Sequence, residues 1–132
     1  MEEMNNENLY RVIDANLNRL REGIRVVEDI CRYGFNNQPI SLRLKQIRHQ
    51  TKIDQTGYIN FRDSSNDVLK TSTKSEQKRE NLNEILIANL KRAQESSRVL
   101  EECFKIIDTE KSELFKKIRY EIYTIEKDIF IS

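Results

Sequence analysis

The chain has 132 residues, of which 37% are hydrophobic and 34% are charged, and its formal net charge is +1. A chain of this length forms one domain with a single core. Its balanced charge argues against a protein that coats nucleic acid, since such domains carry a clear basic excess. Two cysteines, no signal sequence and no apolar run near the roughly 20 residues that cross a membrane favour a reduced, soluble, cytoplasmic protein.

The first part of the chain predicts two helices joined by a short turn. Three glycines and one proline leave few places where a helix can break. Apolar residues at three- and four-residue steps predict a first helix over about residues 8–33, ending near Gly34. Residues 36–39, Asn-Asn-Gln-Pro, supply a cap and a first-turn proline for a second helix, which is expected to end near Ile53.

The second part begins with a segment that lacks helical periodicity. Residues 55–75 are expected to form a connecting loop, and a loop of this length in a small domain is a candidate for function. A capping box, Thr73-x-x-Glu76, predicts the start of a third helix over about 73–107. A fourth helix is expected over about 108–129, with the Asp-Thr pair at its start as the cap.

The first helix is repeated in the third. Residues 15–32 align with residues 88–105, which lie 73 positions later, and eight of the eighteen aligned positions are identical. Average residue frequencies predict about one identity by chance. The second and fourth helices also match, since residues 44–48 align with residues 115–119. The chain therefore contains two copies of one unit.

These copies predict an all-α fold. The expected architecture is a four-helix bundle in a single domain, 1–132, built from two repeated long-short helical hairpins with approximate two-fold symmetry. Repeat A covers about 8–54, the connecting loop about 55–75, and repeat B about 76–130.

Several of the identical positions are polar, which packing alone does not require. Helical spacing places Arg19 and Arg92 inside an apolar sector of each long helix, with Asn16 and Asn89 about one turn before them. A charge in such a sector is costly unless it is paired or faces a polar cavity. Each copy is therefore expected to need a partner or a ligand for its arginine.

Two explanations are open for these arginines. Arg19 and Arg92 could form ion pairs with Glu95 and Glu22 across the two-fold axis and hold the hairpins in register. Alternatively they could face an anionic ligand, with both glutamates at the edge of the sector within reach of a metal ion.

Two further repeated arginines point outward. Arg25 precedes Asp29 by four residues, and Arg98 precedes Glu102 by four. This spacing favours solvated ion pairs on the helix surface.

Glycine-rich phosphate loops and zinc-ligand spacings are absent from the sequence. Any phosphate must therefore be held by arginine side chains and helix N-termini.

The motif V-I-D-A-N-L-x-R-x-R-E-G-x-R-V-x-E-D of residues 12–29, its second copy, and the residues around Arg62-Asp63 and Asp67-Val68 resemble one family. It is the small all-helical hydroxymethylpyrimidine-phosphate kinase family of bacterial thiamin synthesis, whose domain also occurs fused ahead of thiamin-phosphate synthase. The resemblance covers about residues 9–129. It implies phosphorylation of 4-amino-5-hydroxymethyl-2-methylpyrimidine phosphate to the diphosphate, with ATP as co-substrate and Mg²⁺ as cofactor.

The chemistry of such a reaction suggests roles for the repeated residues and for the long loop. The residues expected to act on the transferred phosphoryl group are Arg19, Arg92 and Arg62. Those expected to bind substrate, or to close the sides of the cleft, are Asn16, Asn89, Arg48, Arg119, Arg25 and Arg98. The carboxylates expected to hold magnesium are Glu22 and Glu95, or alternatively Asp63 and Asp67 of the long loop. Such a reaction needs charge neutralisation and in-line placement, because a phosphate acceptor requires no general base.

A second hypothesis treats the chain as a non-catalytic helical adaptor or dimerisation domain associated with thiamin-phosphate synthase. The expected partners are thus the pyrimidine phosphate and ATP, with thiamin-phosphate synthase and a second copy of the chain as open hypotheses. No membrane and no nucleic acid are expected, because acidic residues are interleaved with the basic ones.

Overall fold

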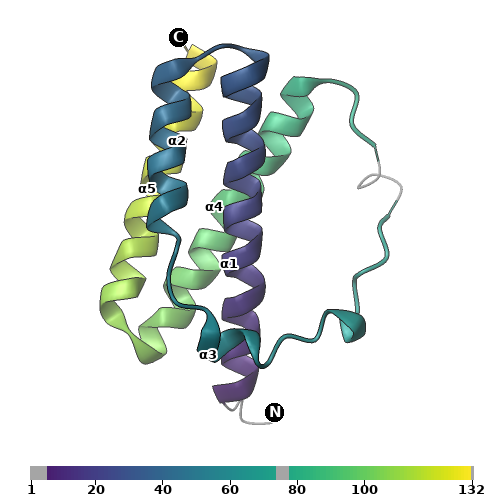
Figure 1. The fold of residues 1–132 in the computed structure, drawn as a ribbon, viewed down its shortest axis with the longest axis vertical. Helices are drawn as coiled ribbons and strands as arrows, with labels where there is room; N and C mark the ends of the chain where they lie inside the picture. Colours follow the sequence, from purple (N-terminus) through teal and green to yellow (C-terminus); the bar gives the residue numbers. More distant parts are fainter. Residues whose placement is uncertain (1–5, 74–77, 132) are drawn as a thin grey trace.

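The computed structural model describes residues 6–73 and 78–131, and every regular element in these ranges is helical (Figure 1). The elements in chain order are α1 (Asn6–Asp29), the π-helix η1 (Ile30–Gly34), α2 (Gln38–Gln50), α3 (Thr56–Ile59), the 3-10 turn η2 (Ser64–Asn66), α4 (Leu82–Ile107) and α5 (Thr109–Ile131). The expected all-α class is confirmed. None of the helices in these ranges is both long enough and apolar enough to cross a membrane.

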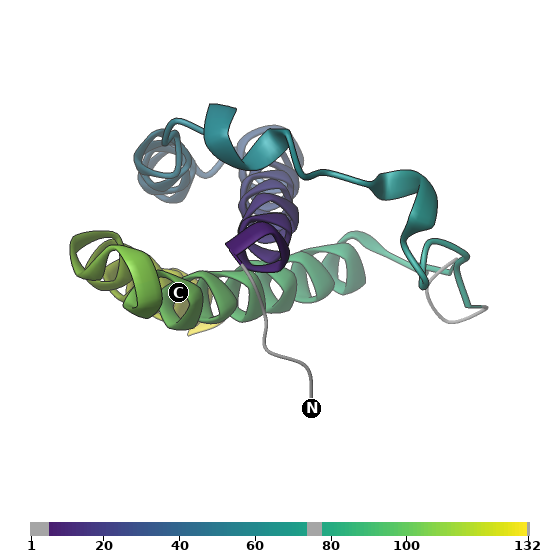
Figure 2. The same cartoon turned by 90° about the horizontal axis from the view of Figure 1, so that it is seen from below.

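Helices α1, α2, α4 and α5 form two hairpins that pack on each other in two layers. Figure 2 shows the α1–α2 hairpin in one layer and the α4–α5 hairpin in the other. Each long helix turns an apolar stripe toward the core. The largest fully buried side chains of α1 and α4 in this core are Ile13, Leu17, Leu20, Ile24, Leu86, Leu90, Leu100 and Phe104.

The starts of α2 and α5 follow the capping signals in the sequence. The Asn37 side chain accepts a hydrogen bond from the Ile40 amide at 3.1 Å, and Pro39 lies in the first turn of α2. Asp108 accepts from the Lys111 amide at 3.2 Å in front of α5. Both predicted starts are confirmed, because a side-chain oxygen at these positions satisfies a free amide of the first turn.

The predicted start of the third helix is wrong. Helix α4 begins at Leu82, after Asn81, whose side chain accepts a hydrogen bond from the Glu84 amide at 2.9 Å. The Glu84 carboxylate accepts from the Glu80 amide at 2.8 Å. This pair acts as a capping box later in the chain than the predicted one at Thr73, whose second member lies outside the described residues.

The second hairpin is not long-short. Helix α5 has 23 residues and α4 has 26, whereas α2 has only 13 and ends before the predicted Ile53. The segment after α2 is also more regular than a loop, since it contains α3 and η2. Thus the fold keeps two hairpins, but only the first has a short second helix.

Helices α1 and α4 approach each other closely where they cross. An added Cβ at Gly23 would lie 3.2 Å from the Asn89 carbonyl oxygen and 3.5 Å from the Ala93 amide nitrogen. Any side chain at position 23 would therefore push the two backbones apart. This close crossing brings the polar repeat of α1 beside that of α4.

Candidate functional site

A cavity of about 350 Å³ lies at the crossing of α1 and α4. Both long helices contribute to its walls, and it is called the crossing cavity below. Its lining residues are Asn16, Arg19, Ala88, Arg92, Glu95, Ser96 and Val99.

Arg19 and Arg92 occupy equivalent positions in the two repeats and line this cavity together. Both side chains are exposed, so the expectation that they are embedded in an apolar surface is wrong: the sector lies at the open edge of the crossing. In residues 6–73 and 78–131 neither guanidinium forms an ion pair, and the alternative pairing with Glu95 and Glu22 is absent there. Two unneutralised guanidinium groups beside one cavity can bind an anion.

The repeated asparagines make the same bond in both copies. Asn16 donates from Nδ2 to the Val12 carbonyl oxygen at 2.9 Å, and Asn89 donates to the Ile85 carbonyl oxygen at 2.8 Å. Each bond ties the amide to the preceding turn of its own helix. Asn16 is buried, while Asn89 is half-buried, so only the first is enclosed at the cavity wall.

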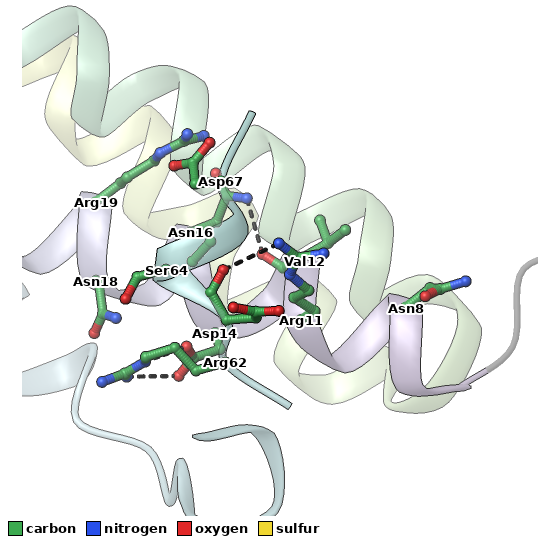
Figure 3. Close-up of a pocket in the computed structure, with 12 residues that line it drawn as sticks. Asn8, Arg11, Val12, Asp14, Asn16, Asn18, Arg19, Arg62, Ser64 and Asp67 are labelled. Carbon is green, nitrogen blue, oxygen red and sulfur yellow. Dashed lines mark hydrogen bonds and ion pairs between the residues drawn. The ribbon is translucent and has the colours of Figure 1, made fainter. Parts of the chain in front are cut away.

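A second cavity, of about 500 Å³, separates α1 from the segment 62–67 and is called the loop cavity. Figure 3 shows side chains from both elements around it. Its lining residues are Asn8, Arg11, Val12, Asp14, Ala15, Asn16, Asn18, Arg19, Arg62, Asp63, Ser64 and Asp67. Asn16 and Arg19 line both cavities, so the two cavities meet at these side chains.

Arg62 is held by a carboxylate that the sequence analysis did not single out. It donates from Nε and Nη2 to Asp14 at 2.6 and 2.8 Å, and Asp14 is only 1% exposed (Figure 3). Gln55 adds a hydrogen bond to Asp14 at 3.1 Å. The hydrogen bond that Arg62 donates to Asp14 raises the pKa of the Arg62 guanidinium above its ordinary value. The sequence did contain a signal for this ion pair: Asp14 lies beside the apolar stripe of α1, where a carboxylate must be paired.

Aromatic rings hold the same segment against α1. The Tyr10 ring lies 5.3 Å from that of Tyr58 and 5.6 Å from that of Phe61, and Tyr58 also meets Phe104 of α4 edge-on at 6.3 Å. Such pairs stabilise a contact beyond their buried area. The ion pair of Arg62 and this ring cluster together fix one wall of the loop cavity.

The four predicted metal-binding carboxylates are divided among three places. Asp63 and Asp67 line the loop cavity, Glu95 lines the crossing cavity, and Glu22 lies in a third cavity next to α2. Over the described part of the chain, three or more acidic, histidine or cysteine side chains nowhere gather in a metal-binding group. Of the two alternative pairs, Asp63 and Asp67 line one cavity together, whereas Glu22 and Glu95 line different cavities.

Asp63 and Asp67 could hold a magnesium ion, since such an ion needs only one or two carboxylates beside water and substrate phosphates. The hydrogen bond from the Asn66 side chain, at 2.7 Å, holds the pKa of Asp63 below its ordinary value. Asp67 accepts a bond from the Leu69 amide at 3.0 Å. The Asp63 carboxylate is thus ionised at neutral pH and fixed in direction.

Arg48 and Arg119 are placed differently from the expectation that they close the sides of the cleft. Arg48 binds the buried Glu28 at 2.7 and 3.2 Å, and Arg119 binds the buried Glu101 at 2.9 and 3.2 Å. These are equivalent positions in the two repeats, and each pair joins the two helices of its own hairpin. Their repetition is therefore explained by architecture, and losing one partner of such a pair is costly.

The outward arginines form the expected surface pairs. Arg25 lies 3.7 Å from Asp29, and Arg98 lies 3.2 Å from Glu102. All four side chains are about half exposed, which keeps such pairs weak. Neither arginine lines the crossing cavity or the loop cavity.

The chain is similar to curated proteins named thiamine-phosphate synthase. It is 35% identical to that of Nostoc punctiforme over 123 residues, which are 92% of this chain and 35% of the relative. It is 36% identical over 128 residues to that of Thermosynechococcus vestitus, and 41% identical over 122 residues to that of Prochlorococcus marinus strain SARG, covering 96% and 91% of this chain and 36% and 35% of those relatives. The chain thus spans about a third of the length of these relatives, and no solved structure matches it.

A family model gives the clearest comparison. The model of the ThiD2 family matches residues 11–128, which include most of both hairpins, the whole lining of the crossing cavity and all of the loop-cavity lining except Asn8. Together with the relatives, this match associates the chain with thiamin biosynthesis. The chain belongs to the ThiD2 family.

Proposed function

We propose that this protein phosphorylates 4-amino-5-hydroxymethyl-2-methylpyrimidine phosphate to the diphosphate, with ATP as the donor. The observation that carries the proposal is the pair of repeat-equivalent arginines, Arg19 and Arg92, that lack ion-pair partners within the described ranges and line one cavity. Ion pairing in the scaffold explains Arg48 and Arg119 but not these two.

The two adjoining cavities suit two phosphorylated substrates. Arg19 reaches both cavities, because it lines the crossing cavity with Arg92 and the loop cavity with Arg62. A guanidinium at this junction would neutralise the donor and acceptor phosphates where they meet, which is the main requirement of phosphoryl transfer. The acceptor oxygen belongs to a phosphate, so the site needs no general base.

In this proposal Asp63 and Asp67 bind the magnesium ion. Both line the loop cavity, as does Arg19, and in Figure 3 Asp67 and Arg19 occupy the same end of it. A magnesium ion bound there would offset the charge of the donor phosphates. A third predicted carboxylate, Glu95, lines the crossing cavity.

Arg62 takes a positioning role rather than a phosphate-binding one. Its guanidinium is already engaged by both oxygens of Asp14. The pair fixes the segment that carries Asp63 and Asp67 on α1, so its loss would displace the carboxylates without removing them.

A turnover assay tests the proposal directly. The purified chain is given ATP and magnesium with either the pyrimidine alcohol or its monophosphate, and products are resolved by chromatography. We expect diphosphate from the monophosphate only. The variant Arg92→Ala should lose this activity, while Lys105→Ala, which removes an exposed helix cation paired with Glu102, should retain it.

The same assay decides the second candidate function. The relatives carry about two thirds of their length outside the matched region, which favours a domain that can serve a larger assembly. A folded chain without turnover of either substrate would exclude the kinase and support the adaptor.

A further inference from the structure

The crossing cavity contains one carboxylate that the binding of an anion does not explain. Arg19 and Arg92 give the lining two positive charges, and Glu95 gives it one negative charge. A ligand with only negative charge would be repelled by Glu95. The lining therefore suits a ligand that presents a hydrogen-bond donor beside its anionic group.

Glu95 forms no ion pair with any described residue, although cations surround it on α4. Residues three or four apart are neighbours on a helix, which places Lys91, Arg92 and Arg98 next to it. Lys91 and Arg98 pair with other glutamates, each at 3.2 Å. The Glu95 carboxylate is thus available to accept a hydrogen bond from a ligand.

A metal ion does not account for this carboxylate. The repeat equivalent of Glu95 is Glu22, which lines a different cavity, so Glu95 is the one carboxylate among the described residues that line the crossing cavity. The two guanidinium groups of the same lining would repel a divalent cation. An N–H donor of the ligand is the partner that remains.

We infer that Glu95 is a specificity-determining residue that accepts a hydrogen bond from the 4-amino group of the pyrimidine phosphate. This role rests on the proposed function, which supplies the ligand. In 4-amino-5-hydroxymethyl-2-methylpyrimidine phosphate the amino group and the phosphorylated arm are attached to adjacent ring carbons. The amine and the phosphate therefore leave the same edge of the ring, and they need a carboxylate next to a cation.

The spacing of residues on α4 matches that edge of the ring. Glu95 follows Arg92 by three residues, so the two side chains are neighbours on the helix, with about 5–6 Å between their Cβ atoms. With the phosphate bound by Arg19 and Arg92, the amino group is directed toward Glu95. Ala88 and Val99 lie one turn before and one turn after this pair and supply apolar contacts for the ring.

The same carboxylate would select against rings that lack the amine. A ligand without the amino group would cover Glu95 and give it no donor. A site that hydrogen-bonds one group of its ligand rejects the analogue lacking that group, because the polar group of the site loses water and gains no partner.

Calorimetric titrations of the full chain in the absence of magnesium test this role. The two ligands are the pyrimidine monophosphate and its analogue with hydrogen in place of the 4-amino group. We expect the wild type to bind the monophosphate at least about tenfold more tightly than the analogue, which corresponds to about 1.4 kcal/mol. Glu95→Ala should abolish this preference by weakening the binding of the monophosphate, while the analogue binds as before or more tightly because a negative charge is removed.

Two further variants separate recognition of the amine from a change in the fold. Glu95→Gln should keep part of the preference, because its amide oxygen still accepts a hydrogen bond from the amine. Glu102→Ala removes an exposed glutamate of α4 outside the crossing cavity, and it should bind both ligands as the wild type does. A full preference in Glu95→Ala would overturn the role, as would a wild type that does not distinguish the ligands. A magnesium-binding Glu95 predicts unchanged affinities, since no metal is present.

The kinase proposal is tested separately from this role. Selective binding through Glu95 without diphosphate formation would contradict the kinase and leave the recognition of the amine intact. Diphosphate formation with an unchanged preference in Glu95→Ala would do the reverse. A wild type that binds neither ligand would contradict both.

Discussion

The two halves of the molecule share a hairpin with equivalent ion pairs, yet among the described residues only the long helix of the first half is tied to a further segment by an ion pair. Asp14 of α1 is buried and binds Arg62, whereas its repeat equivalent on α4, Ile87, is 45% exposed. The Glu28–Arg48 pair, in contrast, is reproduced as Glu101–Arg119. The shared residues thus build the scaffold and its crossing, and the unshared aspartate anchors the segment that makes the first half different.

Removing the repeated arginines should have the largest effect on activity. We expect Arg19→Ala and Arg92→Ala each to lower kcat/KM by roughly 10²–10³-fold, since each removes a charge that neutralises phosphate in the transition state. Circular dichroism and thermal melting should remain unchanged, because both side chains are exposed. If one of the two variants kept full activity, the two halves would not share the reaction.

The hairpin ion pairs should dominate stability rather than activity. Glu28→Gln and Glu101→Gln each leave a largely buried arginine without its carboxylate, and we expect a loss of about 3–5 kcal/mol in the free energy of unfolding. Urea denaturation followed by circular dichroism measures this loss. Comparable losses in both halves would support equivalent roles, and a loss below about 1 kcal/mol, the size expected of an exposed pair, would contradict them.

The segment that Arg62 ties to Asp14 should affect how the activity depends on magnesium. We expect Arg62→Ala to raise the magnesium concentration needed for half-maximal activity by roughly 10–100-fold, as for other residues that orient metal ligands. Activity at saturating magnesium should largely recover, because Asp63 and Asp67 are still present. An unchanged magnesium dependence, or a loss that magnesium does not restore, would rule out the positioning role.

The turn η2, which Asp63 caps, gives the smallest expected effect, and this effect depends on pH. Since the pKa of Asp63 in the folded chain lies below its ordinary value of 3.8, its hydrogen bonds stabilise the fold fully above the unfolded-chain pKa. That contribution is lost as the pH falls through the folded pKa. Asn66→Ala should return the pKa of Asp63 toward 3.8, measured by NMR titration of the carboxyl carbon. An Asn66→Ala variant with an unaltered Asp63 titration would show that another group sets this pKa.

The elements that were predictable from sequence are those set by local signals. The caps at Asn37 and Asp108 and the apolar stripes of the long helices depend on residues within a few positions of each other. The start of α4 was missed because Thr73 and Asn81 each begin a capping sequence, and the helix begins after Asn81. Local chemistry alone does not choose between them.

The site was less predictable because it depends on how helices cross. A helical wheel places Arg19 beside apolar residues, but the exposure of that side chain follows from where α4 leaves α1. Likewise, Glu28 and Arg48 are both repeated in the sequence, yet they are 20 residues apart and meet only because the hairpin closes. The pairing of Asp14 with Arg62 spans 48 residues and has no counterpart in the second repeat.

The most direct test of the central claim is calorimetric titration of the pyrimidine monophosphate into the wild-type chain and the Arg92→Gln variant. If the repeated arginines of the crossing cavity hold the anionic reactants, the wild type binds the monophosphate with one site. The variant then loses at least about tenfold in affinity, the equivalent of roughly 1.4 kcal/mol, while melting at the same temperature. Equal affinities in the two proteins would mean that the arginines of α1 and α4 do not bind the acceptor.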